Sequence, residues 1–422
     1  MRNVSRWRLF RLTLLAVVTT TVTLAAVPVA ATAPGAASTP TAEGSVSRPD
    51  DDPFYSVPRG IRFVHDGTVL RWRRLPAEAM ATPAPAKVWQ LLYKTTDNHG
   101  VPTATVGTLL VPTTHWAAKG PRPLVSYQIP EDGLATKCAP SYLLRAGAEP
   151  SGPTEIRFDQ RQIKDAVERG WSVIVPDYEG PASQFLGAAA AAHGILDGIR
   201  AARSFAPAQI SHRAPLGLWG YSGGGFATAA AAQVQPEYAP ELELRGIAMG
   251  GVIADFNASL QAISGQPFSG WVPFGLAALR RSHPQADINQ YLSPSGVAYA
   301  DAVQHECAGT AVASGPYFAP LSTFEASPGS LSAGAFPSFA HRVSLIGLPG
   351  TPTAPVYLYH GVTDELVPIT AVRQLAHRYR AAGAKVFSVE HDKDHAAEQS
   401  YGVPGAVTFL TQRLSMTKTP PA

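Results

Sequence analysis

The chain has 422 residues, of which 45% are apolar and 15% are charged. That composition supplies a large hydrophobic core and excludes an intrinsically disordered protein. The formal net charge is +3, and four arginines near the N-terminus account for it, so the rest of the chain is nearly neutral. A nucleic-acid-binding protein carries a strong basic surface, so no nucleic-acid partner is expected.

The N-terminal residues 1–33 have the layout of an export signal. The four arginines precede an uncharged run from Leu12, which ends in small residues at Ala31-Thr32-Ala33. An uncleaved membrane anchor is the alternative, because this run approaches spanning length, but several threonines dilute it. We therefore expect a cleaved signal peptide and a secreted protein. Residues 34–52, rich in Ala, Pro, Ser and Thr, are predicted to be a flexible lead-in.

Cys138 and Cys307 are the two cysteines of the chain. In an exported protein they are expected to form one intramolecular disulfide, the alternative being two buried thiols. The sequence contains neither an HExxH motif nor paired CxxC motifs. We therefore expect no metal site and no organic cofactor.

Strand-like apolar runs alternate with helical patterns along most of the chain. Strands are predicted at residues 89–93, 103–111, 123–127, 171–175, 215–219, 244–249, 355–359 and 385–389, and helices at 160–169, 187–204, 225–234, 369–382 and 405–414. This alternation predicts an α/β fold, with a mostly parallel central sheet and helices on both faces.

The alternation stops between residues 255 and 341. Short helical segments and Gly, Pro and Ser breaks fill this interval, with aromatic residues that look exposed: Phe268, Trp271, Phe274, Tyr291, Tyr299, Tyr317, Phe318 and Phe324. An insertion of this length in a sheet domain is typical of a functional cap or lid. It divides the predicted core into residues 53–254 and 342–422.

The sharpest motif is Gly220-Tyr221-Ser222-Gly223-Gly224, between an apolar strand and an Ala-rich helix. This is the G-x-S-x-G pattern of a nucleophile elbow in the strand–turn–helix context that the elbow needs. Because the serine backbone is strained at a sharp turn, glycines are needed two residues before and after it. Ser222 is therefore the predicted nucleophile, and the backbone N–H of Gly223 is predicted to face the developing oxyanion. An ordinary glycine-rich turn is the alternative.

A serine nucleophile needs a base and an orienting carboxylate, which follow it in the order acid, then histidine. Asp364, in the turn after strand 355–359, is the predicted acid, and the alternative is a solvated loop acid or a helix N-cap. The adjacent Glu365 is expected to point elsewhere. Two histidines follow the last strand, and His395 is favoured over His391 by its loop position and reach.

Four further histidines and one further aspartate are expected to have structural or surface roles. His360 precedes the turn glycine and is expected to be packed, and Asp177 is expected to support its turn. His65, His193 and His341 lack a carboxylate-and-loop context, which favours surface or core roles.

Five segments occur in an order known from one protein family: Trp89-Gln90-Leu91-Leu92-Tyr93, Ser126-Tyr127-Gln128 leading to Cys138-Ala139-Pro140-Ser141-Tyr142, Pro176-Asp177-Tyr178-Glu179-Gly180-Pro181, the elbow, and the Asp364 turn. The chain resembles the secretory lipase family, the lipase A type of α/β-hydrolase, from about residue 53 to about residue 414. The Cys-Ala-Pro-Ser-Tyr and Asp-Tyr-Glu-Gly-Pro segments are more specific than the elbow. The resemblance implies an α/β-hydrolase fold with a mainly helical lid that matches residues 255–341.

The resemblance also implies a Ser222–Asp364–His395 triad, which agrees with the strand order. It implies an oxyanion hole made by Gly223 and Asp132, with a shift of one residue to Glu131 left open. An acid there would act through its backbone N–H or a protonated side chain, because a carboxylate would repel the oxyanion.

A disulfide between Cys138 and Cys307 would tie the core to the lid, as the family pattern implies. The apolar stretch 266–279, with Phe268, Trp271 and Phe274, is expected to hold an acyl chain, unless this face simply packs on the core.

The implied function is that of a secreted, monomeric triacylglycerol lipase, which hydrolyses ester or lipid substrates by acyl transfer and contacts a lipid interface transiently. Two alternatives are kept. One is a short-chain or polyester esterase, an acyltransferase or a peptidase that uses the same triad. The other is a non-catalytic surface-binding protein with the hydrolase fold, against which the intact set of three residues argues.

Overall fold

A computed structural model describes residues 46–149 and 155–415. The predicted signal peptide and most of the predicted lead-in lie outside these ranges. Within them, no helix is long and apolar enough to cross a membrane.

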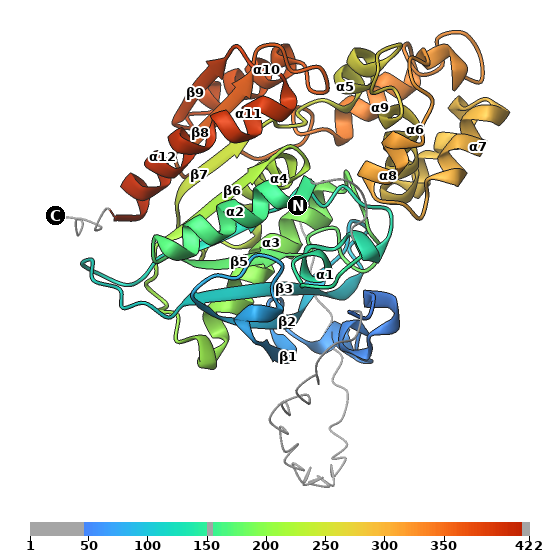
Figure 1. Ribbon diagram of the computed structural model, residues 1–422. Coiled ribbons are helices and arrows are strands. Elements are labelled where there is room, and N and C mark those ends of the chain that lie inside the picture. Colours follow the sequence, from blue (N-terminus) through green and yellow to red (C-terminus); the bar gives the residue numbers. More distant parts are fainter. Residues whose placement is uncertain (1–45, 150–154, 416–422) are drawn as a thin grey trace, which may run out of the picture. The chain divides into compact units, whose positions relative to one another are not determined.

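A nine-stranded sheet runs through the described chain (Figure 1). The strands are β1 (Val69–Leu75), β2 (Ala86–Thr96), β3 (Pro102–Pro112), β4 (Leu124–Gln128), β5 (Ser172–Pro176), β6 (Leu216–Tyr221), β7 (Leu244–Gly250), β8 (Val356–Gly361) and β9 (Val386–His391). Their order in the sheet is β1-β2-β3-β5-β4-β6-β7-β8-β9. The pairs β1–β2, β2–β3 and β3–β5 are antiparallel, and all other neighbours are parallel. The prediction of a mostly parallel sheet is confirmed.

Helices cover both faces of this sheet. The α-helices are α1 (Pro140–Leu143), α2 (Glu155–Glu168), α3 (Ala188–Ser204), α4 (Gly223–Tyr238), α5 (Phe256–Ile263), α6 (Trp271–Ser282), α7 (Pro294–Ala302), α8 (Ala308–Ala313), α9 (Ala335–Val343), α10 (Ile369–Ala381), α11 (His395–Tyr401) and α12 (Val403–Ser415). Short 3₁₀ segments are η1 (Pro49–Asp51), η2 (Pro53–Tyr55), η3 (Ile61–Phe63), η4 (Ala77–Ala79), η5 (Thr136–Cys138), η6 (Ala206–Ala208), η7 (Pro284–Ala286), η8 (Ile288–Tyr291) and η9 (Leu321–Thr323).

The central strands are apolar on both sides because each side faces a different helical layer. In β5, Ile174 joins the core under α3, α4 and α10, whereas Val173 and Val175 join the core under α2 and α12. Successive side chains of a strand point to opposite faces, so a strand covered on both sides needs an unbroken apolar run. That is why these strands were predictable from the sequence.

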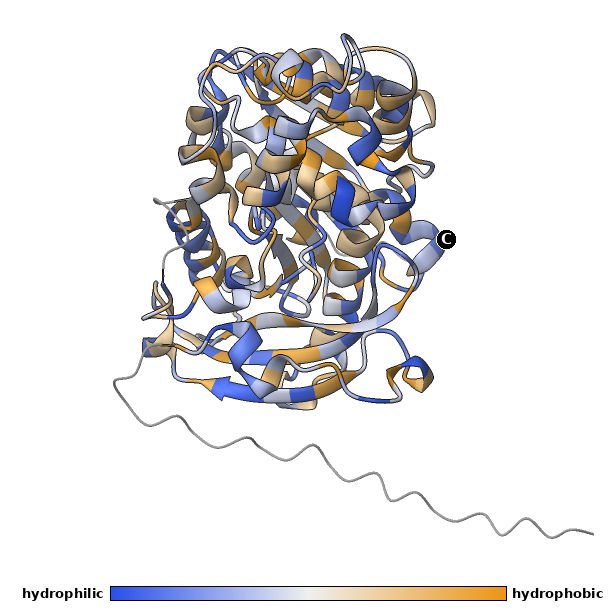
Figure 2. Ribbon diagram, turned by 90° about the vertical axis from the view of Figure 1, so that its right-hand side faces the viewer, coloured by the Kyte–Doolittle hydropathy of each residue, from blue (hydrophilic) through white to orange (hydrophobic). Residues whose placement is uncertain are grey.

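The edge strand β1 was not predicted. Its sequence, Val-Leu-Arg-Trp-Arg-Arg-Leu, has three arginines, and it pairs on one side only, with β2. In Figure 2 this lowest strand is largely hydrophilic. An edge strand with one solvated face carries charged residues, so it lacks the apolar signal of a buried strand.

The interval between β7 and β8 is helical, with no strand in its described residues, as predicted. The expectation that its aromatic residues are exposed is wrong for Phe274 and Phe324, which are both fully buried. The ring of Phe274 packs against Phe185 at 5.8 Å between centroids, and the ring of Phe324 packs against Tyr299 at 5.7 Å. The segment α5–α9, called the helical insertion below, therefore buries aromatic rings both within itself and against the sheet domain, in one continuous apolar cluster.

The predicted lead-in is ordered over its last seven residues, contrary to the expectation. Pro49 is buried at the start of η1, and Asp52 forms an ion pair of 2.6 Å with Arg73 of β1. Arg73 also stacks over the ring of Phe54 at 4.3 Å. Contacts with a distant strand give this segment a fixed conformation that its composition alone does not predict.

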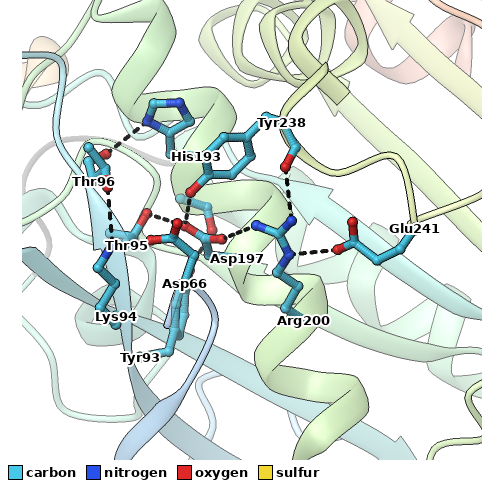
Figure 3. A network of polar contacts seen from close by, with 11 residues as sticks. Asp66, Tyr93, Lys94, Thr95, Thr96, His193, Asp197, Arg200, Tyr238 and Glu241 are labelled. Atoms are coloured by element: carbon cyan, nitrogen blue, oxygen red, sulfur yellow. Dashed lines mark hydrogen bonds and ion pairs between the residues drawn. The ribbon is translucent and has the colours of Figure 1, made fainter. Parts of the chain in front are cut away.

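A buried polar network joins β2, α3 and the end of α4 (Figure 3). Asp197 of α3 is fully buried, and its Oδ2 accepts hydrogen bonds from the hydroxyls of Thr95 (2.8 Å) and Tyr238 (2.9 Å). Its Oδ1 accepts from Arg200 at 2.9 Å, and Arg200 also pairs with Glu241 at 2.7 Å. Burial raises the pKa of Asp197 to about 6, against the lowering effect of these donors. The network attaches two helices to β2.

Asp197→Ala is expected to destabilise the fold. Without this carboxylate, Arg200 loses one of its two acidic partners, and the hydroxyls of Thr95 and Tyr238 lose their acceptor. The free energy of unfolding should therefore fall by about 3 kcal/mol. Urea denaturation measures the free energy of unfolding. The control is Arg373→Ala, which breaks a surface ion pair with Glu390 and should have a much smaller effect. Equal losses in the two variants would contradict this prediction.

Candidate active site

Ser222 lies at the turn between β6 and α4, with φ of 55° and ψ of −123°. This left-handed backbone is strained for a residue with a Cβ atom. The flanking glycines have no room for a side chain. A Cβ on Gly220 would lie 2.3 Å from the carbonyl oxygen of Gly224, and one on Gly224 would lie 2.0 Å from the carbonyl oxygen of Gln128. The chain therefore forms the sharp strand–turn–helix that the motif predicts.

Three side chains from distant parts of the chain meet at this turn. The Oγ of Ser222 lies 2.9 Å from Nε2 of His395, and Nδ1 of His395 lies 2.7 Å from Oδ2 of Asp364. Asp364 and His395 are both nine-tenths buried or more. The structure thus brings together the three residues chosen from the sequence, in a hydrogen-bonded line.

Backbone contacts orient the acid and the histidine. Oδ1 of Asp364 accepts hydrogen bonds from the backbone N–H groups of Leu366 (3.0 Å) and Val367 (2.8 Å). His395 is the first residue of α11 rather than a loop residue, and its backbone N–H donates to Oε2 of Glu365 at 3.1 Å. The hydroxyl of Tyr221, beside the serine, donates to the carbonyl oxygen of His395 at 2.7 Å. The carboxylate of Glu365 therefore supports His395 by binding the backbone N–H of the histidine.

Asp364 and His395 shift each other's pKa in opposite directions. Burial lowers the pKa of His395, but the hydrogen bond and charge of Asp364 outweigh burial, so the net shift is upward from 6.5. Burial raises the pKa of Asp364, and the bond and charge of His395 reverse this, so the net shift is downward from 3.8. An ionised Asp364 is therefore in place to stabilise a protonated His395.

The other histidines lie elsewhere. Nδ1 of His391 lies 2.8 Å from Oε1 of Glu398, away from the serine. His360 is buried, with Nε2 3.0 Å from the carbonyl oxygen of Val367 and 3.5 Å from Asp364, so it packs behind the acid. Nδ1 of His193 lies 3.2 Å from the Thr96 carbonyl oxygen, His341 is half-exposed beside Asp255, and His65 is exposed.

The loop at residues 130–134 lies directly over the elbow. Asp132 has φ of 38°, a left-handed conformation, and its side chain is buried beside Gly223. A Cβ on Gly223 would lie 1.8 Å from Oδ1 of Asp132, so only glycine permits this approach. Gly223 is also the first residue of α4, where backbone N–H groups have no partner within the helix. Both residues chosen for the oxyanion hole thus border the serine.

The core holds this loop from below through two buried glutamates. Oε2 of Glu179 accepts from the backbone N–H of Gly133 at 3.1 Å. Oε2 of Glu131 accepts from the backbone N–H of Glu179 at 3.2 Å, and the backbone N–H of Glu131 donates to the Tyr178 hydroxyl at 3.0 Å. Sequence reasoning missed this role. The available signal was the position of Glu179 inside the specific Asp-Tyr-Glu-Gly-Pro segment.

The helical insertion holds the same loop from the other side. Gly133 and Cys307 form an antiparallel bridge, with the Leu134 N–H donating to the Glu306 carbonyl and the Ala308 N–H donating to the Asp132 carbonyl, each at 2.9 Å. Cys307 is also disulfide-bonded to Cys138, four residues after Leu134. The expected disulfide is present, and it links the core to the insertion.

A narrow apolar cavity of about 70 Å³ opens beside the serine. Asp132, Ser222 and His395 lie at its polar end. Its walls come from α5, α6 and three core loops, and consist of Phe185, Leu186, Ile253, Phe256, Ser259, Leu260, Ile263, Trp271, Gly275, Leu279, Leu366 and Val367. The cavity therefore suits an aliphatic chain.

The three aromatic residues of the predicted acyl site occupy different places. Trp271 lines the cavity, whereas Phe274 lies behind it, with ring centroids 5.7 Å apart. Phe268 is 40% exposed and does not line the cavity. No group of His, Cys, Asp or Glu side chains within the described ranges is arranged to hold a metal ion.

Asp177 supports the turn after β5, and it is fully enclosed. Oδ1 accepts from the backbone N–H of Ser141 at 2.7 Å, and Oδ2 accepts from its hydroxyl at 2.5 Å. Burial raises the pKa of Asp177 to about 7, although both bonds lower it. Burial also raises the pKa of Glu131 and of Glu179.

These shifts predict that stability falls as pH rises. Between the ordinary pKa of 3.8 and about 7, the folded state holds a proton at Asp177 that the unfolded state has lost. The unfolding free energy should therefore decrease over this range, and Asp177→Asn should remove about 4 kcal/mol of that decrease. Urea denaturation at about pH 4 and about pH 8 measures the difference. Parallel pH profiles of the two proteins would contradict the prediction.

Comparisons with known proteins find lipases among the relatives of this chain. Residues 146–420 match the family model described as "Secretory lipase". Lipase A of Arthroderma benhamiae is 34% identical over 89% of this chain and 81% of its own length. Lipase 6 of Candida albicans is 32% identical over 88% and 82%. A Mycobacterium tuberculosis relative, 33% identical over 87% and 82%, is named "Probable inactive lipase MT1628".

Solved structures show the same fold. Candida antarctica lipase A in its closed state superposes with a TM-score of 0.80 at 25% identity, covering 89% of both chains. An esterase from Xanthomonas oryzae superposes with a TM-score of 0.65 at 20% identity, covering 83% of this chain and 99% of the other, and supports the α/β-hydrolase fold alone. Because the family model spans more than half of the chain and several relatives exceed 30% identity, this protein belongs to the secretory lipase family.

Proposed function

We propose that this protein is a secreted serine ester hydrolase that acts on triacylglycerols. The observation that carries the proposal is the hydrogen-bonded line from Ser222 through His395 to Asp364, beside an apolar cavity. Membership of the secretory lipase family supports the reaction class and export.

The first half of the reaction forms an acyl-enzyme. Nε2 of His395 accepts the Ser222 hydroxyl proton as Oγ bonds to the ester carbonyl carbon, and Asp364 stabilises the imidazolium. The negative charge moves to the former carbonyl oxygen, beside the backbone N–H groups of Gly223 and Asp132. Collapse of this intermediate breaks the bond to the alcohol oxygen, which takes the proton from His395 and leaves.

The second half repeats these steps with water. His395 accepts a proton from water as the water oxygen bonds to the acyl carbon, and the same N–H groups hold the second oxyanion. Collapse breaks the bond to Ser222, whose Oγ regains its proton from His395, and the carboxylic acid leaves. The protein's own residues carry every proton transfer in this scheme.

The cavity and the surface support a lipid substrate. The cavity walls are almost wholly aliphatic or aromatic, so they favour an acyl chain over a polar group. On the surface, Tyr317 and Phe318 are 57% and 63% exposed, and the Phe318 N–H donates to the Gln266 carbonyl, which brings them close to the exposed Phe268. This aromatic patch is suited to transient contact with a lipid interface.

The non-catalytic alternative gains weight from the relative named probable inactive. In this chain, however, the serine, histidine and aspartate are all present and in contact. A binding protein would have no need of a strained serine backbone, whose cost persists only where the surrounding structure imposes it.

His395→Gln is expected to lower kcat by about 10⁴-fold or more, since the serine loses its base. The matched control is His391→Gln, four residues earlier and paired with Glu398, which should leave kcat nearly unchanged. For each variant, kcat is measured with p-nitrophenyl esters from acetate to palmitate, and Ser222→Ala is assayed in parallel. Wild-type protein without activity on any chain length would contradict the proposed function, and equal losses in the two histidine variants would contradict the choice of base.

Trp271→Ala should widen the cavity and shift the chain-length preference, because the indole forms part of its wall. Phe268→Ala, on the same segment but outside the cavity, should leave the preference unchanged with soluble esters. The measurement is kcat/KM against acyl length. Identical preferences in wild type and Trp271→Ala would count against the cavity as the acyl site.

A further inference from the structure

Helix α6 ends in two adjacent arginines that bind different parts of the protein. Arg280 donates to side-chain oxygens of Asp301 (2.6 Å) and Asn289 (3.2 Å), which both belong to the helical insertion. Arg281 instead reaches the core, where Nη1 of its guanidinium donates to the carbonyl oxygen of Leu134 at 2.5 Å. The insertion therefore contacts the 130–134 loop through a charged side chain as well as through the backbone bridge and the disulfide.

The Arg281 guanidinium joins three segments of the chain. Nη1 also donates to the carbonyl oxygen of Ala182, in the turn after β5, at 3.4 Å, and Nη2 donates to the carbonyl oxygen of Gln304 at 2.5 Å. A guanidinium presents its N–H donors in a rigid fork, so it holds carbonyl groups of different segments at fixed relative positions. Bonds from a charged donor are also stronger than bonds between neutral groups. This one side chain thus fixes the loop relative to both the insertion and the core.

The carbonyl that Arg281 holds is close in the chain to the residue beside the reacting serine. Leu134 follows Asp132 by two residues, and Asp132 is buried with φ of 38°. A left-handed backbone of this kind persists only where the surrounding structure imposes it. Glu179 binds the intervening backbone N–H of Gly133 from the core, and Arg281 binds the loop from the side of the insertion.

Arg281 acts on the substrate only through the groups that it holds. Its helix lines the acyl cavity with Trp271, Gly275 and Leu279, but Arg281 itself does not line the cavity. We propose that Arg281 is a positioning residue for the 130–134 loop, so that the insertion supports the charge of the transition state as well as the acyl chain. This inference rests on the proposed ester hydrolysis.

The expected kinetic signature follows from where the charge develops. The ester carbonyl oxygen is nearly neutral in the bound substrate and negative in the transition state, so an accurately placed loop matters mainly in the transition state. Loss of Arg281 should therefore lower kcat and kcat/KM together and leave KM nearly unchanged. The loss should be the same for every acyl length, because the loop borders the reacting carbonyl and not the chain.

The kinetic test replaces Arg281 by Gln, which removes the charge and the fork, and by Lys, which keeps the charge alone. On p-nitrophenyl esters from acetate to palmitate, Arg281→Gln is expected to lower kcat by about 10- to 100-fold, with KM within about twofold of wild type. Arg281→Lys should lose less. The matched control Arg280→Gln breaks contacts within the insertion only and should keep the wild-type kcat.

Several results would overturn the proposal. An unchanged kcat in Arg281→Gln would show that the loop needs no such support. A loss that grows with acyl length, or a raised KM with kcat kept, would mean that Arg281 only shapes the cavity. Equal losses in Arg280→Gln and Arg281→Gln would indicate a general disturbance of α6. Failure of both Arg281 variants to fold where Arg280→Gln folds would make the role of Arg281 structural.

A binding measurement separates this inference from the proposed function. The boron of 1-octaneboronic acid bonds to Oγ of Ser222, the hydroxyl proton passes to His395, and boron becomes a tetrahedral anion with an oxygen at the oxyanion site. 1-Octanol has the same chain and forms no such bond. Both compete with a fluorescent acyl probe. Arg281→Gln should weaken binding of the boronic acid by about tenfold or more, and that of 1-octanol by less than about twofold.

The affinity ratio of these two ligands does not depend on ester hydrolysis. A ratio that falls in Arg281→Gln and is kept in Arg280→Gln supports the inference, even if the wild-type protein hydrolyses no ester and the proposed function fails. A ratio that Arg281→Gln leaves unchanged overturns the inference, even if esters are hydrolysed. Wild-type protein that binds the boronic acid no more tightly than 1-octanol overturns it as well.

Discussion

The close approach of the 130–134 loop to the elbow is the constraint on which the rest of this structure depends. A side chain on Gly223 would collide with Asp132 at 1.8 Å, and one on Gly224 would collide with the Gln128 carbonyl oxygen at 2.0 Å. Two glycines therefore allow β4, its following loop and α4 to meet at one point. The strained Ser222 lies at that point, so the nucleophile and the backbone that faces it share one rigid support.

The helical insertion takes part in that support. Its residue Cys307 pairs with Gly133 along the backbone and with Cys138 through the disulfide. The insertion also provides most of the cavity wall, through α5 and α6. The same segment thus shapes the space for the substrate and holds the loop beside the reacting oxygen. A change in the insertion that moved Cys307 would be felt at Asp132, because the backbone bridge joins them directly.

Charge is distributed unevenly around the serine. On one side, Asp364 accepts hydrogen bonds from two backbone N–H groups and from Nδ1 of His395, and the contact with His395 lowers its pKa, so that it stays ionised. On the other side, burial raises the pKa of Glu131 and of Glu179, and among the described residues neither has a cationic partner at hydrogen-bond distance. This upward shift reduces the tendency of these two acids to carry a negative charge near the oxyanion.

Local patterns in the sequence determined the parts of this protein whose physical cause is local. Apolar runs predicted the strands that are buried on both faces, and Gly-x-Ser-x-Gly predicted the turn at Ser222, because both depend on neighbouring residues. Strand order and loop position favoured His395 as the base, but they did not exclude His391. Only the tertiary structure decided that His395 faces the serine, that Phe274 is buried while Trp271 lines the cavity, and that Glu179 supports the loop. These depend on the packing of segments far apart in the chain, which no local pattern records.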